Sequence, residues 1–224
     1  MSVKHKVVTI DGPAGTGKST VAKGLAEALG FSYFDTGALY RAITWKVFQE
    51  GISLHDHKKL GALLRAFSFH IKEGHYYVGT TDVTKAIRSK EVTAQVSAVS
   101  ALSQVREALK PIQVSVSEET DAVFEGRDLG TVVFPHADLK FFLTARAEVR
   151  AQRRLKDLQE KFPEQSFSFE KILQEIQERD AYDSNRTLAP LKQADDAVLV
   201  DTSDLSILEV IDQMKGIYDQ RVKS

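Results

Sequence analysis

Apolar residues along the chain fall into short runs and spaced stripes, which predict alternating strands and helices. Runs of strand length occupy 6–10, 31–35, 121–126, 139–143 and 197–201. Stripes with helical spacing predict helices at about 21–29, 36–48, 54–67, 105–117, 147–161, 169–182 and 205–222. Near-continuous apolar runs are typical of strands in a parallel sheet that is covered on both faces. We therefore expect an α/β fold in which a parallel sheet is flanked by helices, with right-handed connections.

Helix ends and helix faces can also be predicted. Thr36 is a suitable N-cap for the helix at 36–48, and Gly30 is a suitable end for the helix before it. Pro111 indicates either the start of a helix or a kink within one. Two later helices carry apolar faces that we expect in the core: Phe169, Ile172, Leu173 and Ile176 in one, and Ile207, Val210, Ile211, Met214, Ile217 and Tyr218 in the other.

The stretch from Gly51 to about Ser103 interrupts the alternation of strands and helices. It contains two short aromatic runs, 69–72 and 76–78, which predict a β-hairpin. We interpret this stretch as an insertion within a single domain that spans residues 1–224. A second interruption at 156–168 is charged and contains Pro163, which favours a mobile flap.

The composition is that of an ordinary globular chain. Of the 224 residues, 42% are hydrophobic and 27% are charged, and the net charge of −1 gives no attraction to nucleic acid or anionic membrane. The absence of cysteine excludes disulfides and thiolate metal sites and favours the cytoplasm. No apolar run approaches the roughly 18–20 residues of a membrane span, and the N-terminal run is too short for a signal peptide. We expect a cytoplasmic monomer with no nucleic-acid or membrane partner.

The strongest motif follows the first predicted strand. Residues 12–20 fit the phosphate-binding P-loop pattern G-x-x-x-x-G-K-[ST]: Gly12, Pro13, Ala14, Gly15, Thr16, Gly17, Lys18, Ser19 and Thr20. The glycines let backbone N–H groups point inward, and the start of the following helix favours a polyphosphate. In this pattern Lys18 reaches the β- and γ-phosphates of a nucleotide, and the Ser19 hydroxyl faces Mg²⁺.

Among P-loop proteins, a small-molecule kinase fits best. GTPase switches read guanine through an N-K-x-D segment, whereas the only asparagine here, Asn185, is followed by Arg186. Motors and transporters generally need a larger chain or a partner. A kinase also needs an acceptor site, and three polar clusters that contain arginine lie beside predicted strands, at 35–41, 126–135 and 179–191. Strand ends converge in such a sheet, and arginine suits bidentate contact with phosphate.

These clusters, together with the P-loop and the stretch 82–92, resemble bacterial-type cytidylate kinases over about residues 7–201. The resemblance implies Mg²⁺-dependent transfer of a phosphoryl group from ATP to CMP or dCMP. It also implies a region that binds the acceptor monophosphate at about 37–103 and a short lid at about 154–168. The residue at position 36 is often serine in that family, and Thr36 retains the hydroxyl.

The resemblance further implies roles for individual residues. The acceptor phosphate would be contacted by Thr36, Arg41 and Arg127. Cytosine would be read by Ser97, Arg106 and Asp128, with Ser100 and Ser103 as alternatives to Ser97. Ribose and phosphate would be contacted by Arg179, Asp183 and Arg186. The residues expected to act in catalysis are Lys18, Arg127 and Arg186.

Some questions stay open at this stage. The attacking phosphate oxygen is already ionised, so no general base is needed. Asp11 and Glu125 both end strands near the P-loop, and either can orient a water on Mg²⁺. Arg153 and Arg154 border the lid, and they either close onto the transferred phosphoryl group or form a solvated helix face. A kinase for another nucleoside monophosphate and a non-catalytic nucleotide-binding protein are the alternatives, and acceptor-dependent ADP production separates them.

Overall fold

A computed structural model describes residues 4–222. Its larger sheet has five strands in the order β2-β6-β1-β7-β8. The strands are β1 (Val7–Asp11), β2 (Ser32–Asp35), β6 (Ala122–Glu125), β7 (Leu139–Thr144) and β8 (Val198–Asp201). Strand β1 pairs in parallel with β6 and β7, and β7 pairs in parallel with β8. The predicted α/β fold with a parallel sheet is confirmed.

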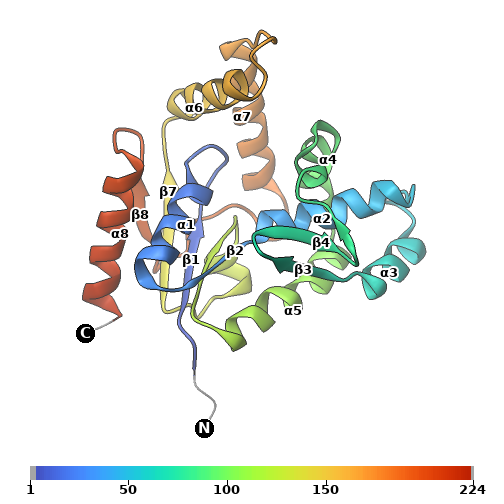
Figure 1. Cartoon of the computed structure of the whole chain (residues 1–224), viewed down its shortest axis with the longest axis horizontal. Helices are drawn as coiled ribbons and strands as arrows, with labels where there is room; N and C mark the ends of the chain where they lie inside the picture. Colours follow the sequence, from blue (N-terminus) through green and yellow to red (C-terminus); the bar gives the residue numbers. More distant parts are fainter. Residues whose placement is uncertain (1–3, 223–224) are drawn as a thin grey trace. The chain divides into compact units, whose positions relative to one another are not determined.

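The chain divides into two compact units, which are described separately. The first consists of the chain up to Phe34 and from Val116 onward. Its helical elements are α1 (Lys18–Leu29), η2 (Leu129–Val133), α6 (Ala147–Lys161), α7 (Phe169–Asn185) and α8 (Ile207–Arg221). The second unit is Asp35–Ser115. It holds α2 (Thr36–Gln49), α3 (His57–Ala66), η1 (Ala86–Arg88), α4 (Lys90–Ser100) and most of α5 (Ser103–Glu119) (Figure 1).

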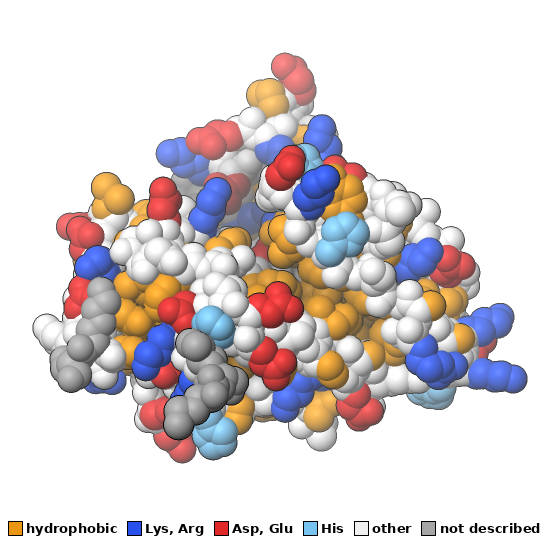
Figure 2. Space-filling model, turned by 60° about the horizontal axis from the view of Figure 1, so that its bottom comes forward, with side chains coloured by type: hydrophobic (Ala, Val, Ile, Leu, Met, Phe, Trp, Pro, Cys, Tyr) orange, Lys and Arg blue, Asp and Glu red, His pale blue; other side chains and the backbone are white. Residues whose placement is uncertain are grey.

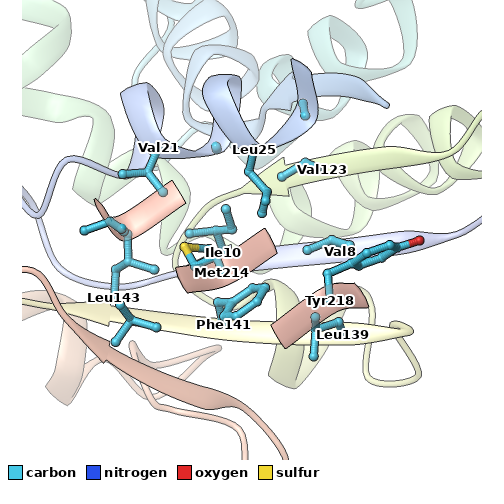
Figure 3. Close-up of a cluster of buried hydrophobic side chains, with 14 residues drawn as sticks. Val8, Ile10, Val21, Leu25, Val123, Leu139, Phe141, Leu143, Met214 and Tyr218 are labelled. Carbon is cyan, nitrogen blue, oxygen red and sulfur yellow. The ribbon is translucent and has the colours of Figure 1, made fainter. Parts of the chain in front are cut away.

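One apolar cluster fills the space between the sheet of the first unit and two of its helices. Ile10 of β1 and Phe141 of β7 lie against Leu25 of α1 and Met214 of α8, and all four are almost fully buried (Figure 3). Alternate residues of a strand point to opposite faces, so Thr9 and Asp11 face away from this cluster. One face of β1, the strand that leads into the P-loop, therefore packs on the apolar core. Its other face carries polar side chains.

The predicted helix faces are largely confirmed. Ile172 and Ile176 of α7 are buried, with Phe169 and Leu173 packed around them. Val210 and Met214 of α8 are buried in the core. Ile207, by contrast, is 38% exposed, because it is the first residue of α8.

The second unit contains a small antiparallel sheet of β3 (Phe69–Lys72), β4 (His75–Val78) and β5 (Thr81–Asp82). The predicted hairpin is confirmed, since β3 and β4 pair directly. Its two-residue turn, Glu73 and Gly74, has positive φ at both positions, which matches the twist of paired strands. Strand β5 was not predicted, because two residues carry no periodic signal.

Other predicted boundaries in the second unit were wrong. Asp35, not Thr36, is the N-cap of α2, because its carboxylate accepts a hydrogen bond from the Ala38 N–H. Helix α3 begins at His57 rather than near Leu54, because Asp56 caps it. Helix α4 was not predicted, although Val92, Val96 and Val99 form a buried stripe with helical spacing.

Three further features of the described chain bear on the expectations. Pro111 lies inside α5, so the helix continues through it. None of the helices in residues 4–222 has the length and apolarity that crossing a membrane requires. Figure 2 shows basic and acidic side chains intermixed with apolar ones over one face, so the small net charge does not conceal a single-sign patch there.

Candidate active site

The P-loop occupies the carboxyl end of β1, at the centre of the sheet. Gly12, Gly15 and Gly17 all have positive φ, between 78° and 147°, as the motif predicts. A Cβ on Gly12 would lie 2.1 Å from the Leu143 carbonyl oxygen, so only glycine fits there. In the described chain, Gly17 at the N-cap brings no side-chain acceptor to the first turn of α1. The N–H groups of that turn are therefore left for an anion.

Lys18 is the first residue of α1 and is only 6% exposed. Its ammonium group donates to the Pro13 carbonyl oxygen at 2.6 Å, inside the curve of the P-loop. Burial lowers the pKa of Lys18, and the Arg127 cation nearby lowers it further. Two cations that repel each other at the end of a phosphate-binding loop favour a polyanion between them, because its charge would remove the repulsion.

Arg127 connects the P-loop to α7. Its guanidinium donates to the Gly12 carbonyl oxygen at 2.9 Å and lies 3.4 Å from the Asp183 carboxylate. Arg179, one turn before Asp183 on the same helix, lies 3.9 Å from that carboxylate. Asp183 is buried, so its charge is balanced by two arginines from different parts of the chain. The structure thus brings together three of the residues that the sequence analysis selected.

Asp128 and Arg186 form a second ion pair in this unit. Their charged groups lie 3.3 Å apart, and each side chain is more than nine-tenths buried. Arg186 also donates to the Ala189 carbonyl oxygen at 2.6 Å. Ala189 has φ of 50°, a left-handed conformation that is uncommon for a residue with a side chain. The chain after α7 thus turns at Ala189, whose carbonyl oxygen accepts from the Arg186 guanidinium.

Arg150, which the sequence analysis did not select, is buried beside the P-loop. Its guanidinium donates to the Ala14 carbonyl oxygen at 3.0 Å and pairs with Asp180 of α7 at 2.6 Å. A Cβ on Gly15 would lie 3.1 Å from the Cβ of Arg150, so α6 packs directly on the loop. The available signal was its place on the helix that follows the carboxyl end of β7.

The two arginines that border the predicted lid differ in their surroundings. Arg153 donates to the Thr202 carbonyl oxygen at 2.6 Å and to the Thr202 hydroxyl at 3.1 Å. The Thr202 hydroxyl in turn donates to the Thr16 carbonyl oxygen at 3.1 Å. Arg153 therefore supports the P-loop indirectly, through Thr202. Arg154 is exposed. The predicted flap is partly helical, because α6 continues to Lys161.

The second unit gathers its own set of predicted residues on α2. Thr36 is buried in the first turn, and Arg41 donates to the Thr93 hydroxyl at 2.9 Å. Arg88 lies beside them, with its guanidinium 3.4 Å from the Asp35 carboxylate. The sequence analysis did not give Arg88 a role, although it lies in the stretch 82–92 that carries part of the resemblance.

Arg106 is also held against α2. It is 8% exposed, its guanidinium lies 5.6 Å from the centre of the Tyr40 ring, and it donates to the Ser100 carbonyl oxygen at 3.2 Å. Ser97 is half-buried on α4, and the Ser100 hydroxyl donates to its carbonyl oxygen at 3.0 Å. The side chain of Ser100 is thus turned toward its own helix, and Ser103 is exposed.

A family model described as cytidylate kinase matches residues 8–220 of the chain. The chain belongs to the cytidylate kinase family. Among curated relatives, a cytidylate kinase of Protochlamydia amoebophila (strain UWE25) is 54% identical over 211 residues, which is 92% of each chain. One of Halalkalibacterium halodurans is 45% identical over 225 residues, which covers 98% of this chain and all of the relative.

A solved structure shares the fold of this cytidylate kinase family member at low identity. An uncharacterized protein from Eubacterium ventriosum aligns with a TM-score of 0.50 and 12% identity, covering 97% of this chain and 100% of the other. That likeness concerns the fold alone. Family membership makes the chain a phosphotransferase of the nucleotide-binding P-loop class.

The carboxylates at two strand ends have different partners. Asp11 accepts hydrogen bonds from the Leu129 and Gly130 N–H groups at 3.0 and 2.8 Å. Burial raises the pKa of Asp11 to about 6, although these two N–H groups oppose the rise. Glu125 accepts a hydrogen bond from the Tyr33 hydroxyl, and its negative charge opposes the lowering of the Lys18 pKa by burial and Arg127. Both oxygens of Asp11 thus accept from backbone N–H groups, and the charges of Glu125 and Asp11 both favour the Lys18 cation.

Proposed function

We propose that this protein transfers the γ-phosphoryl group of ATP to CMP and dCMP, which yields ADP with CDP or dCDP. The observation that carries the proposal is the gathering of Lys18 and Arg127 at a P-loop in a chain of the cytidylate kinase family. Phosphoryl transfer depends on positioning and on neutralising charge rather than on covalent chemistry. A set of buried cations around a phosphate-binding loop supplies both.

The donor phosphates are bound by the P-loop, residues 12–20. The backbone N–H groups of the first turn of α1 bind phosphate oxygens, and the Lys18 ammonium group turns from the Pro13 carbonyl toward the β- and γ-phosphates. Arg150 and Arg153 hold the loop in shape through its carbonyl oxygens and Thr202. None of these residues exchanges a proton with the substrate, so the loop acts as a rigid electrostatic frame.

The residues present fit Mg²⁺. Ser19 is exposed on the first turn of α1, where its hydroxyl can coordinate a cation bound to the nucleotide, and Glu125 can accept from a water on that cation. Within residues 4–222 no three carboxylate or histidine side chains gather as a metal site. Mg²⁺ in nucleotide sites needs no such group, since phosphates and water supply most ligands. When bound, the ion neutralises charge on the transferred group.

The acceptor phosphate is bound by Thr36, Arg41 and Arg127, with Arg179 and Arg186 in support. Arg88 joins this set because Asp35, the cap of α2, holds its guanidinium near the start of the same helix. Arg127 has a double role, because it reaches the P-loop through Gly12 as well as Asp183. These contacts support a role for Arg127 in acting on the phosphoryl group during transfer, together with Lys18 and Arg186.

The base is read by Ser97, Arg106 and Asp128. Cytosine presents an amino group that donates, where uracil presents an oxygen that accepts. The Asp128 carboxylate, which is paired with Arg186, accepts from that amino group. Arg106 has donors only, which suits the acceptor atoms N3 and O2 of cytosine. Asp183 accepts from ribose hydroxyls. The acceptor-binding region at about 37–103 and the lid at about 154–168 complete this assignment.

An acceptor-panel assay tests the proposal. The purified chain is given ATP with Mg²⁺ and one of CMP, dCMP, UMP, AMP or GMP, and ADP is measured. We expect rapid ADP production with CMP and dCMP, and rates lower by about 10²-fold or more with UMP. A preference for a purine monophosphate would make the chain a kinase for another acceptor. ADP production that does not depend on any acceptor would overturn the kinase assignment.

A further inference from the structure

A buried polar row lies on the face of the sheet opposite the apolar core. Thr9 and Asp11 of β1 share this face, and Lys140 of β7 is the register partner of Thr9. All three are at most 5% exposed. Burying a polar group costs free energy unless the group forms a hydrogen bond or an ion pair, so the contacts of these side chains are informative.

The segment that covers this row is the turn η2, residues 129–133. A Cβ on Gly130 would lie 3.1 Å from the Lys140 side chain, 3.3 Å from the Thr9 hydroxyl and 3.4 Å from an Asp11 oxygen. Glycine at this position therefore allows the backbone to lie directly on the polar row. The turn follows immediately after Arg127 and Asp128.

Asp11 holds the beginning of the turn. Its Oδ1 accepts from the Leu129 N–H at 3.0 Å, and its Oδ2 accepts from the Gly130 N–H at 2.8 Å. Two oxygens of one rigid carboxylate thus fix two consecutive peptide groups, which restricts both the position and the rotation of the backbone after Asp128.

Lys140 holds the end of the same segment. Its ammonium group donates to the Pro135 carbonyl oxygen at 2.7 Å and to the Asp196 carboxylate at 2.9 Å. It therefore does not serve as the counter-ion of Asp11, although both lie on one face. The segment 128–135 is fastened at both ends to strands of the sheet.

We infer that Asp11 is a positioning residue for acceptor recognition, which acts by holding Arg127 and Asp128 in place through the backbone of residues 129 and 130. The inference rests on the proposed function. It assigns Asp11 to the acceptor side rather than to a water on Mg²⁺. Because Gly12 follows Asp11 and accepts from Arg127, one short stretch aligns the donor loop with the acceptor residues.

The test compares Asp11→Asn with two other variants. An asparagine keeps one acceptor oxygen but presents an NH₂ group to the second N–H, so one bond is lost and two donors oppose each other. We expect kcat/KM for CMP to fall by about 10²-fold, because displacement of Arg127 and Asp128 would misplace the acceptor relative to the donor phosphates. KM for ATP should change by less than about threefold, and the CMP/UMP ratio should fall. Gly130→Ala, which displaces the same contact from the other side, should give the same pattern.

Thr9→Val is the matched control, because the Thr9 hydroxyl lies on the same row and, in the described chain, has no hydrogen-bond partner. It should leave the ratio and both KM values unchanged. If Asp11→Asn and Gly130→Ala both fold and keep the wild-type CMP/UMP ratio, the inference is wrong. The inference is also wrong if Asp11→Asn raises KM for ATP and leaves kcat/KM for CMP unchanged. A wild type without CMP-dependent ADP production would instead overturn the proposed function.

Discussion

The Asp128 carboxylate and the Arg186 guanidinium lie 3.3 Å apart, with more than nine-tenths of each side chain buried. One of these residues is proposed to read the base and the other to bind phosphate. Their pairing means that neither charge lacks a partner before the substrate arrives. Removing one partner of such a pair commonly costs about 3–5 kcal/mol, because the other charge stays buried. Substitutions here must therefore keep the pair while changing its chemistry.

Asp128→Asn meets that condition, because an amide oxygen still accepts from Arg186. We expect the preference for CMP over UMP, roughly 10²–10⁴-fold in the wild type, to narrow, since the amide can also donate to the uracil O4. Measurement of kcat/KM for both acceptors tests this. Asp180→Asn alters another carboxylate that pairs with arginine and should leave the ratio unchanged. An unchanged ratio in Asp128→Asn, with both rates reduced, would limit Asp128 to its pairing with Arg186.

Lys18→Ala should lower kcat by about 10²–10³-fold, as expected for the loss of a charge over the reacting phosphates. Its fold should be retained, because burial and Arg127 already disfavour the Lys18 cation. Steady-state rates and thermal unfolding decide the matter. Lys23→Ala, an exposed lysine on the same helix, is the control and should behave as wild type. Near-normal turnover by a folded Lys18→Ala variant would show that the P-loop is not the donor site.

The pH dependence of stability should carry a contribution from Asp11. Its pKa is raised in the folded chain from 3.8 to about 6, so the folded chain binds the proton more tightly than the unfolded chain. This contribution is fully present below about pH 4 and is lost as pH rises to about 6, by about 3 kcal/mol in total. The free energy of unfolding of wild type relative to Asp11→Asn should fall through that window and level off above it. A constant difference from pH 4 to pH 8 would contradict the raised pKa.

Local signals account for what could be predicted from the sequence. The bounds of α6 were predicted correctly, because Ala147 follows a strand end and Pro163 follows the last turn. The P-loop glycines were predicted from the motif, and Gly12, Gly15 and Gly17 have the positive φ that favours glycine. Helix α4 was missed because small polar residues obscure its valine stripe, although Ser89 caps it.

Long-range contacts account for what could not be predicted. Arg150 looks like one charge among many on a polar helix, and only folding places it against Ala14 and Asp180. Asp11 looks like the end of a strand, yet its partners lie more than a hundred residues away in the chain. The roles carried over from the family resemblance remain predictions, because proximity to a partner does not show what a side chain binds.

Asp183→Asn should impair the acceptor more than the donor. Its carboxylate lies 3.4 Å from Arg127 and 3.9 Å from Arg179, so the neutral amide leaves two arginines with weaker anchors. We expect kcat/KM for CMP to fall by about 10²-fold and the losses for CMP and dCMP to differ, since deoxyribose has one hydroxyl fewer to offer. Parallel kinetics with both acceptors provide the measurement. Equal losses would exclude contact with the 2′-hydroxyl and leave Asp183 as an anchor for the arginines or as a partner of the 3′-hydroxyl, which both sugars carry. No loss for either acceptor would remove Asp183 from the site.

Arg150→Met should weaken the support of the P-loop without touching the acceptor. Methionine keeps much of the length of the arginine side chain. It cannot donate to the Ala14 carbonyl oxygen, and it leaves Asp180 without the cation that pairs with it. The free energy of unfolding should fall by roughly 2–3 kcal/mol, less than for a fully buried pair, because 21% of the Asp180 side chain remains exposed.

The kinetic consequence of Arg150→Met follows from the position of Ala14. A P-loop that is less well held should bind ATP more weakly, so KM for ATP should rise by about tenfold while KM for CMP changes little. Arg154→Met removes an exposed arginine one turn further along α6 and separates loss of support for the loop from loss of charge near the lid. If Arg154→Met raises KM for ATP more than Arg150→Met does, direct contact of the lid with phosphate outweighs the support that Arg150 gives to the loop.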